Sequence, residues 1–169
     1  MNQDLTEQSS SRLLSRNSLS DPAVWACIVS ILVGVSFWWI APLIYTNDTP
    51  GYIEGARALL GLSGGNYSYW RTPGFPFFVL STGVATGLTL HLLVLLQLLM
   101  GVLIPVLIYC SLSWINRWLA LSASILCSLS LVPFLNVAYI MPNQLFCFTV
   151  ALATYVACRY LETRNVKYL

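Results

Sequence analysis

Charged residues are scarce in this sequence. Of its 169 residues only 8% are charged, whereas 57% are hydrophobic; an ordinary soluble domain has roughly 25% charged residues. A fold surrounded by water could not cover so many apolar side chains, so the composition excludes an ordinary soluble domain. We expect lipid to be the solvent for most of the chain.

Three further absences narrow the class of protein. The eight basic residues form no run and no basic-aromatic stripe, so nucleic acid is not an expected partner. The five cysteines include no CxxC pair, and there is a single histidine, so we predict no metal ligands among them and interpret the cysteines as small apolar residues of helices. No segment alternates polar and apolar residues as a barrel strand does.

Long apolar runs are present instead. Lipid admits few structures other than helices, and about 20 apolar residues cross a bilayer. The runs predict an all-α membrane protein, a bundle of four or five transmembrane helices between a disordered cytoplasmic tail over residues 1–22 and a short cytoplasmic tail over 164–169, so that the helical domain covers 23–163. The runs are 23–45, 74–88, 89–111, 118–140 and 144–161.

Polar and small residues inside these runs predict contacts between helices. Ser30 and Gly34 are four residues apart, a spacing of small side chains that lets a neighbouring helix approach closely. Gln97 lies deep in an apolar run, where an amide side chain is expected to hydrogen-bond a neighbouring helix.

The positions of the basic residues favour four crossings over five. Arg12 and Arg16 place the N-terminus in the cytoplasm. Five crossings would put Arg117 and the basic C-terminal tail outside, against the tendency of basic residues to stay inside. The run 74–88 has 15 residues and opens with a Gly-Phe-Pro sequence, so we predict that it does not cross. Five crossings remain the alternative.

The predicted outer loop, residues 46–73, contains a helix signal. Thr49 is the expected cap, and Pro50 suits the first helical position. From Tyr52 onward apolar residues recur at helical spacing, with charged residues on the other side, which predicts an amphipathic helix in the membrane interface that ends at Gly61. Four crossings would put this loop on the same face as the turn at 141–143.

The order of residues from Asp48 to Gln97 resembles the beginning of the GT-C superfamily of glycosyltransferases, and most closely the bacterial relatives of protein O-mannosyltransferases and of the lipid A aminoarabinose transferase. Its most specific element is the stretch Arg71-Thr72-Pro73-Gly74-Phe75-Pro76. The likeness covers about residues 23 to 163 and extends to Gly101 and Pro133. It implies transfer of a sugar from a polyprenyl-phosphate carrier to an acceptor, with inversion, at the outer face of a bacterial inner membrane.

The resemblance also implies roles for single residues. Asp48 would be the catalytic residue and would accept the proton of the acceptor hydroxyl or hold a divalent metal that assists; the cofactor stays open. Arg71 would bind the carrier phosphate. The other implied residues are Tyr52, Tyr69 and Trp70 for substrate binding and Pro73, Gly74 and Pro76 for the shape of the loop.

The residues themselves fit simpler interpretations equally well. Asp48 precedes a predicted helix, where an acidic side chain often acts as a cap. Arg71 and the aromatic residues beside it are also typical of anchors at the level of the lipid headgroups. Both interpretations of this loop therefore stay open at this point.

Two departures from the family pattern leave a second function open. Relatives often carry a second acid in the outer turn before the last run, where this chain reads Met141-Pro142-Asn143-Gln144. The family's enzymes are also several times longer. We therefore expect either the N-terminal part of a transferase, completed by further chain or by a partner membrane protein, or a small accessory or translocase-like protein that binds lipid-linked sugars without chemistry.

Overall fold

A computed structural model describes residues 21–40, 48–62, 74–87, 90–138 and 142–165. Every regular element in these ranges is a helix. Four of the predicted site residues, Tyr69, Trp70, Arg71 and Pro73, lie outside the described residues.

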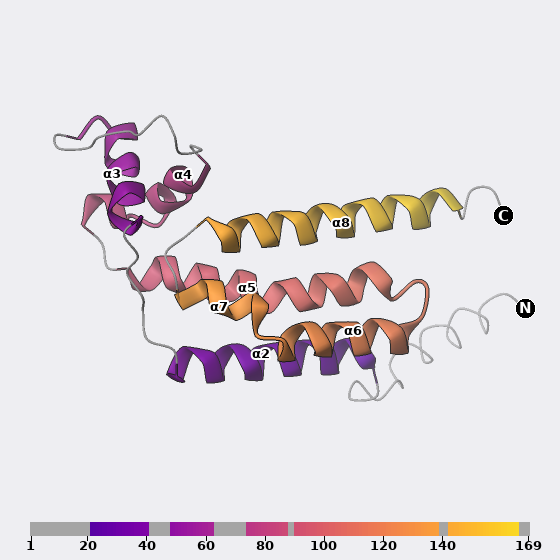
Figure 1. Ribbon diagram of the computed structural model, residues 1–169. Coiled ribbons are helices and arrows are strands. Elements are labelled where there is room, and N and C mark those ends of the chain that lie inside the picture. The colour runs from indigo at the N-terminus through magenta and orange to yellow at the C-terminus, as the bar shows by residue number, and fades with distance from the viewer. Residues whose placement is uncertain (1–20, 41–47, 63–73, 88–89, 139–141, 166–169) are drawn as a thin grey trace, which may run out of the picture.

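Five helices lie along one another and form what we call the bundle (Figure 1). One helix, α5, contacts the other four. In its most apolar stretch 39% of the residues are buried, against 17% for α2 and 6% for α8, so α5 is the centre of the bundle and α8 lies at its edge. The five helices are α2 (Pro22–Ile40), α5 (His91–Leu112), α6 (Arg117–Leu129), α7 (Val132–Ala138) and α8 (Asn143–Asn165).

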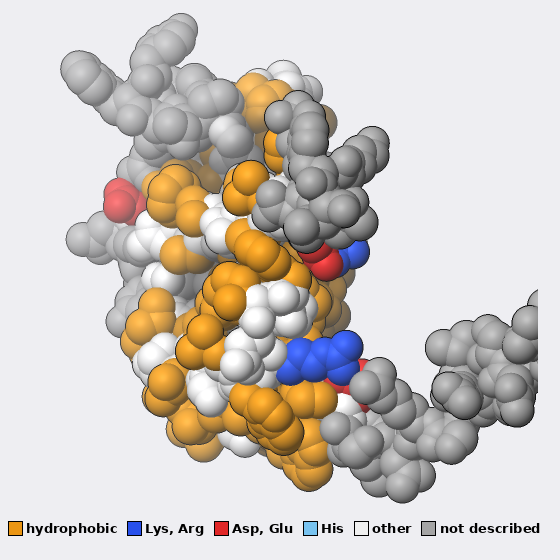
Figure 2. Space-filling view, turned by 90° about the vertical axis from the view of Figure 1, so that its right-hand side faces the viewer, with side chains coloured by type: hydrophobic (Ala, Val, Ile, Leu, Met, Phe, Trp, Pro, Cys, Tyr) orange, Lys and Arg blue, Asp and Glu red, His pale blue; other side chains and the backbone are white. Residues whose placement is uncertain are grey.

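Three of these helices, α2, α5 and α8, are long and apolar enough to cross a membrane. Large apolar side chains point away from the bundle axis: Leu32 is 61% exposed, Leu126 68% and Phe146 69%. Seen along the bundle from the end where α2 begins, hydrophobic side chains cover most of the described surface, with a few charged ones among them (Figure 2). This distribution suits a hydrocarbon solvent.

The run 118–140, predicted as one helix, is broken in two. Helix α6 ends at Leu129, α7 begins at Val132, and Leu131 between them has a left-handed backbone with φ 59°. Pro133 has no N–H to donate to the carbonyl of Leu129, and proline is favoured in the first turn of a helix, so it starts α7 and cannot continue α6. The prediction of a single helix here is wrong, although α6 and α7 in succession run the length of α5 (Figure 1).

Small residues allow the helices to approach closely, as the spacing of Ser30 and Gly34 predicted. Ser30 is fully buried, and its Oγ lies 3.0 Å from the Oγ of Ser128 on α6. A Cβ on Gly34 would come within 2.7 Å of Val102 on α5. The prediction that this pair admits neighbouring helices is confirmed.

Three short helices pack together at one end of the bundle (Figure 1). They are α3 (Thr49–Leu59), α4 (Gly74–Ser81) and the 3-10 helix η2 (Val84–Thr86), and we call them the cap. The run 74–88 thus forms two helices of 8 and 3 residues, each far shorter than a crossing requires. We call the end of the bundle where α2 ends and α5 and α8 begin the cap end (Figure 1). The other end of the bundle is called the opposite end.

Candidate functional site

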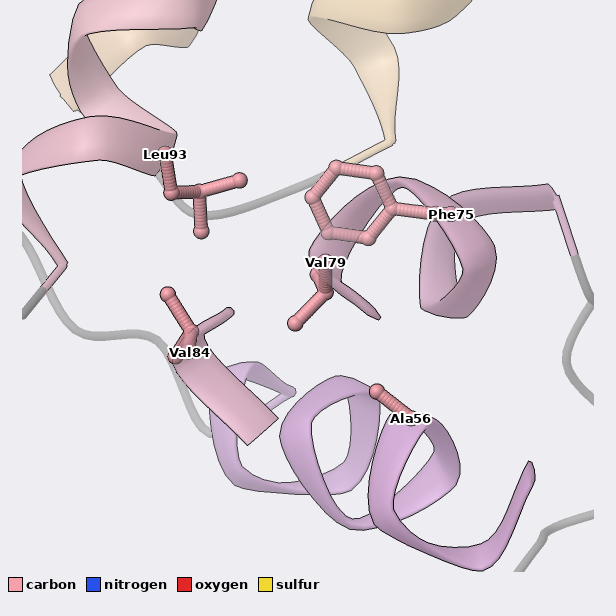
Figure 3. Packing of buried hydrophobic residues seen from close by; sticks show 5 residues of the cluster. All are labelled: Ala56, Phe75, Val79, Val84 and Leu93. Carbon is pink, nitrogen blue, oxygen red and sulfur yellow. The ribbon is translucent and has the colours of Figure 1, made fainter. Parts of the chain in front are cut away.

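The cap has an apolar core that is shared with the bundle. Ala56 from α3, Phe75 and Val79 from α4 and Val84 from η2 point toward one another, and Leu93 from α5 completes the cluster (Figure 3). All five side chains are buried. Because Leu93 belongs to a bundle helix, the cap is seated on the first turns of α5.

Tyr52, a predicted substrate-binding residue, is half-buried and belongs to this packing. Its ring meets that of Phe75 edge to face, with ring centroids 4.9 Å apart and an interplanar angle of 86°. This is a favoured arrangement of aromatic pairs. The contact orients the first turn of α3 against the first turn of α4, so Tyr52 has a packing role whether or not it meets a substrate.

Helix α3 ends where the sequence predicted. Gly61 has a left-handed φ of 68°, and its N–H donates to the oxygen of Ala58 while the N–H of Leu62 donates to the oxygen of Arg57. These two bonds form a Schellman motif, which favours glycine at this position. The predicted stop at Gly61 is confirmed.

The apolar side of α3 is only partly available to lipid. Ile53 packs against the cap core, while Glu54 and Arg57 are exposed on the other side. Leu59 and Leu60 are 39% and 43% exposed. The amphipathic pattern therefore serves packing first, and a location in the membrane interface stays a prediction.

Asp48 occupies the cap position of α3, one residue before the predicted Thr49, which is the first helical residue and fully buried. The Asp48 side chain is exposed and makes no capping hydrogen bond, and its backbone is already helical (φ −87°, ψ −21°). A capping residue normally has an extended backbone and accepts a bond from the first turn.

Two other helix starts show what a side-chain cap looks like in this chain. Asn116, with an extended backbone, accepts from the N–H groups of Trp118 at 2.9 Å and Leu119 at 3.2 Å. Asp21 accepts from the N–H of Ala23 at 3.1 Å. The contrast argues against the interpretation of Asp48 as a helix cap.

The start of α8 is fixed beside the cap. Leu145 packs against the cap core, and Gln144, fully buried, donates from Nε2 to the main-chain oxygen of Gln97 at 3.2 Å. A Cβ on Gly101 would lie 2.8 Å from the oxygen of Pro133 and 3.2 Å from that Nε2, so glycine is required for this approach. This hydrogen bond between helices uses the main-chain oxygen of Gln97, whereas the expected one from its amide side chain stays a prediction.

The buried amide of Gln144 has a further property. Its Oε1 has no hydrogen-bond partner within the described part of the chain. Neither this amide nor that of Asn143 can take up a proton at neutral pH. The sequence signalled this position, but the hydrogen bond that fixes it depends on the fold.

The ionisable side chains at the cap end are few. In the described ranges they are Asp48, Tyr52, Glu54, Arg57 and His91, of which only Tyr52 is not exposed. The described residues contain no group of three or more His, Cys, Asp or Glu that could hold a metal, so they do not by themselves make a divalent-metal site. One exposed carboxylate can still act as a proton acceptor.

The remaining residues predicted to shape the loop are Pro76 and Gly74, and they differ in how tightly they are packed. Pro76 is fully buried in the first turn of α4, where its missing N–H costs the helix nothing. Gly74 opens the same helix, but a Cβ there would meet nothing within 4 Å, so packing does not require glycine.

Comparisons with protein-family models, with curated proteins and with solved structures found no match to this chain.

Proposed function

We propose that this chain acts in a membrane glycosyltransferase that moves a sugar from a polyprenyl-phosphate carrier to an acceptor at the membrane surface, with Asp48 as the catalytic base. The observation that carries the proposal is the position of Asp48: its side chain is exposed at the start of α3, at the cap end of the bundle. The resemblance of residues 48 to 97 to GT-C enzymes supplies the reaction.

The proposed transfer is a displacement at the anomeric carbon of the sugar. The oxygen of the acceptor hydroxyl attacks the anomeric carbon, the bond from that carbon to the phosphate oxygen breaks, and polyprenyl phosphate leaves. The Asp48 carboxylate takes the hydroxyl proton as the new bond forms. Arg71 would balance the charge of the phosphate. Tyr69 and Trp70 would lie against the sugar.

The test replaces Asp48 by asparagine, which keeps the shape but cannot accept the proton. Transfer of labelled sugar from a panel of polyprenyl-phosphate hexoses is measured in membranes that contain the full chain. We expect a loss of about 10²- to 10⁴-fold, the usual contribution of a general base. Glu54→Gln is the matched control, because Glu54 is an exposed acid on the same helix, and it should keep full transfer. Unchanged transfer by Asp48→Asn would refute the proposal.

A second function is favoured by one observation. The start of α8 presents the exposed amide of Asn143 in place of an acid, and amides bind sugar hydroxyl groups without chemistry. The chain would then be an accessory or translocase-like protein for lipid-linked sugars. Binding of a polyprenyl-phosphate hexose that is undiminished in Asp48→Asn, with no transfer by either protein, would favour this function.

We further propose that the bundle crosses a bacterial inner membrane four times, with α6 and α7 together as the third crossing. Arg117 at the start of α6 and Arg159 near the end of α8 would then lie on the cytoplasmic side with the N-terminus, as basic residues prefer. The cap would face outward. With the native cysteines replaced by alanine, a cysteine at Leu62 should react with an impermeant maleimide from outside, and one at Thr163 only after permeabilisation. Labelling of both from one side would contradict four crossings.

A further inference from the structure

An apolar groove lies between α5 and α8 over much of their length. It has a volume of about 430 Å³ and is lined by residues from Ile104 to Leu112 on α5 and from Phe146 to Cys158 on α8. The groove lies away from Asp48 and runs toward the opposite end of the bundle, so it is independent of the proposed transfer reaction.

The walls of the groove offer no free hydrogen-bond donors from their two hydroxyl-bearing side chains. Ser111 Oγ donates to the oxygen of Leu107 at 2.7 Å, and Thr154 Oγ1 donates to the oxygen of Val150 at 2.9 Å. Both protons are directed at the backbone of their own helix. An occupant therefore meets hydrocarbon surface, which suits an apolar chain.

The length of the groove suits a single acyl chain. From Phe146 to Cys158 is a span of 12 residues, or about 18 Å at 1.5 Å per residue. Half of a hydrocarbon core is about 15 Å thick. The acyl chains of one leaflet fill that half, so a single acyl chain fits the groove in length.

A cation stands where the groove ends. Arg159 directly follows the last lining residue of α8, Cys158. Its side chain is 52% exposed, and its Nη1 pairs with Glu162. A guanidinium has five N–H donors, so the pair leaves donors for a phosphate. Figure 2 shows the few blue basic side chains at this end of the molecule.

From these observations we propose that the groove between α5 and α8 binds one acyl chain of an anionic phospholipid, whose phosphate is held by Arg159. The lipid belongs to the leaflet at the opposite end of the bundle from the cap. It lies along α8, the least buried of the long helices, and so stabilises the contact of α8 with α5.

The proposal is tested by native mass spectrometry of the full chain in a mild detergent, with palmitoyl-oleoyl phosphatidylglycerol or phosphatidylcholine as the probe. One phosphatidylglycerol should be retained per chain, about tenfold over phosphatidylcholine. Ala151→Phe fills the groove and should lower lipid retention at least tenfold. Ala153→Phe is the matched control, since Ala153 is exposed on the same helix outside the groove, and it should retain lipid as the native chain does.

Arg159→Gln separates the charge from the groove. This variant should retain both lipids equally, because the acyl chain still fits and the phosphate has lost its partner. Equal retention of both lipids by the native chain, or unchanged retention by Ala151→Phe, would overturn the proposal. A dimer that excludes lipid would also overturn it, because a second copy would then occupy the groove.

One measurement needs no substituted chain and so does not depend on the folding of Ala151→Phe. The melting temperature of the native protein in detergent should rise on addition of phosphatidylglycerol and not of phosphatidylcholine, because a ligand that binds only the folded state stabilises it. The same shift with both lipids, or none, would contradict the proposal.

Discussion

The cap and the bundle differ in the side chains that they expose. In the bundle small or polar residues such as Ser30 and Gln144 are buried beside large apolar ones such as Phe134, while leucines and a phenylalanine face outward. In the cap the buried positions hold Phe75, Val79 and Val84, and charged residues lie on the surface. The bundle thus exposes large apolar side chains, as helices in lipid do, while the cap has charged residues on its surface.

The difference teaches how each region is stabilised. Where lipid is the solvent, burying leucine gains nothing, so close approach and hydrogen bonds hold the helices. Where water is the solvent, burial of apolar area is the main driving force. Substitutions of one type should therefore act differently in the two regions.

The largest effect is expected in the cap core. Phe75→Ala should destabilise the cap by about 3–5 kcal/mol, because it leaves a cavity where a ring was buried. Trypsin should then cut after the exposed Arg57 at least a hundredfold faster, since about 1.4 kcal/mol corresponds to a factor of ten. Phe77→Ala on the same helix, where the ring is 55% exposed, should change the rate by a small factor only. Equal rates in the two variants would contradict an apolar cap core.

The outward leucines test whether lipid surrounds the bundle. If α6 and α7 make the proposed third crossing, Leu126→Asp should disfavour its insertion by about 3 kcal/mol, the cost of an acid near the centre of a crossing helix. Leu60→Asp places the same residue on the cap surface and should change stability by about 0.5 kcal/mol or less. The measurement is the fraction of chain that is inserted in microsomes. If Leu126→Asp inserts as well as Leu60→Asp does, lipid does not surround α6.

The smallest effect concerns the buried serine pair. Ser128 Oγ donates its single proton to the oxygen of Ser124 at 3.1 Å, so Ser30 must donate to Ser128. A double-mutant cycle with Ser30→Ala and Ser128→Ala should give a coupling of about 0.6 kcal/mol, the average for such bonds in membranes. The free energies of unfolding would be measured in detergent micelles. Strictly additive effects would show that close packing alone holds α2 to α6.

The sequence predicted the cap and the bundle unequally. Apolar runs located α2, α5 and α8 because lipid forces a long crossing helix into a visible stretch of residues, and Gly61 marked the end of α3 through its left-handed backbone. The break at Leu131 was missed. Pro133 was its signal, but a proline inside an apolar run also fits a kinked helix.

The sequence identified residues of the candidate site but not the contacts that these residues make. Asp48 was singled out, yet its exposure and its missing capping bond depend on how α3 packs against α4. Tyr52 and Phe75, which pack on each other, lie on either side of residues 63–73, which are outside the described ranges. No local sequence pattern encodes such a pair. The likeness to GT-C enzymes stays a prediction.

The division of the proposed third crossing into α6 and α7 has a consequence for biosynthesis. Thirteen residues make a helix of about 20 Å, and the seven of α7 about 10 Å, so neither piece alone spans a ~30 Å core. A translocon that inserts helices one at a time would not recognise either piece as a crossing segment. We expect α6 and α7 to enter the bilayer late, against a surface that α2 and α5 have already formed. Because α2 and α5 precede α6 in the chain, they are synthesised first, and their surface is present when α6 and α7 enter.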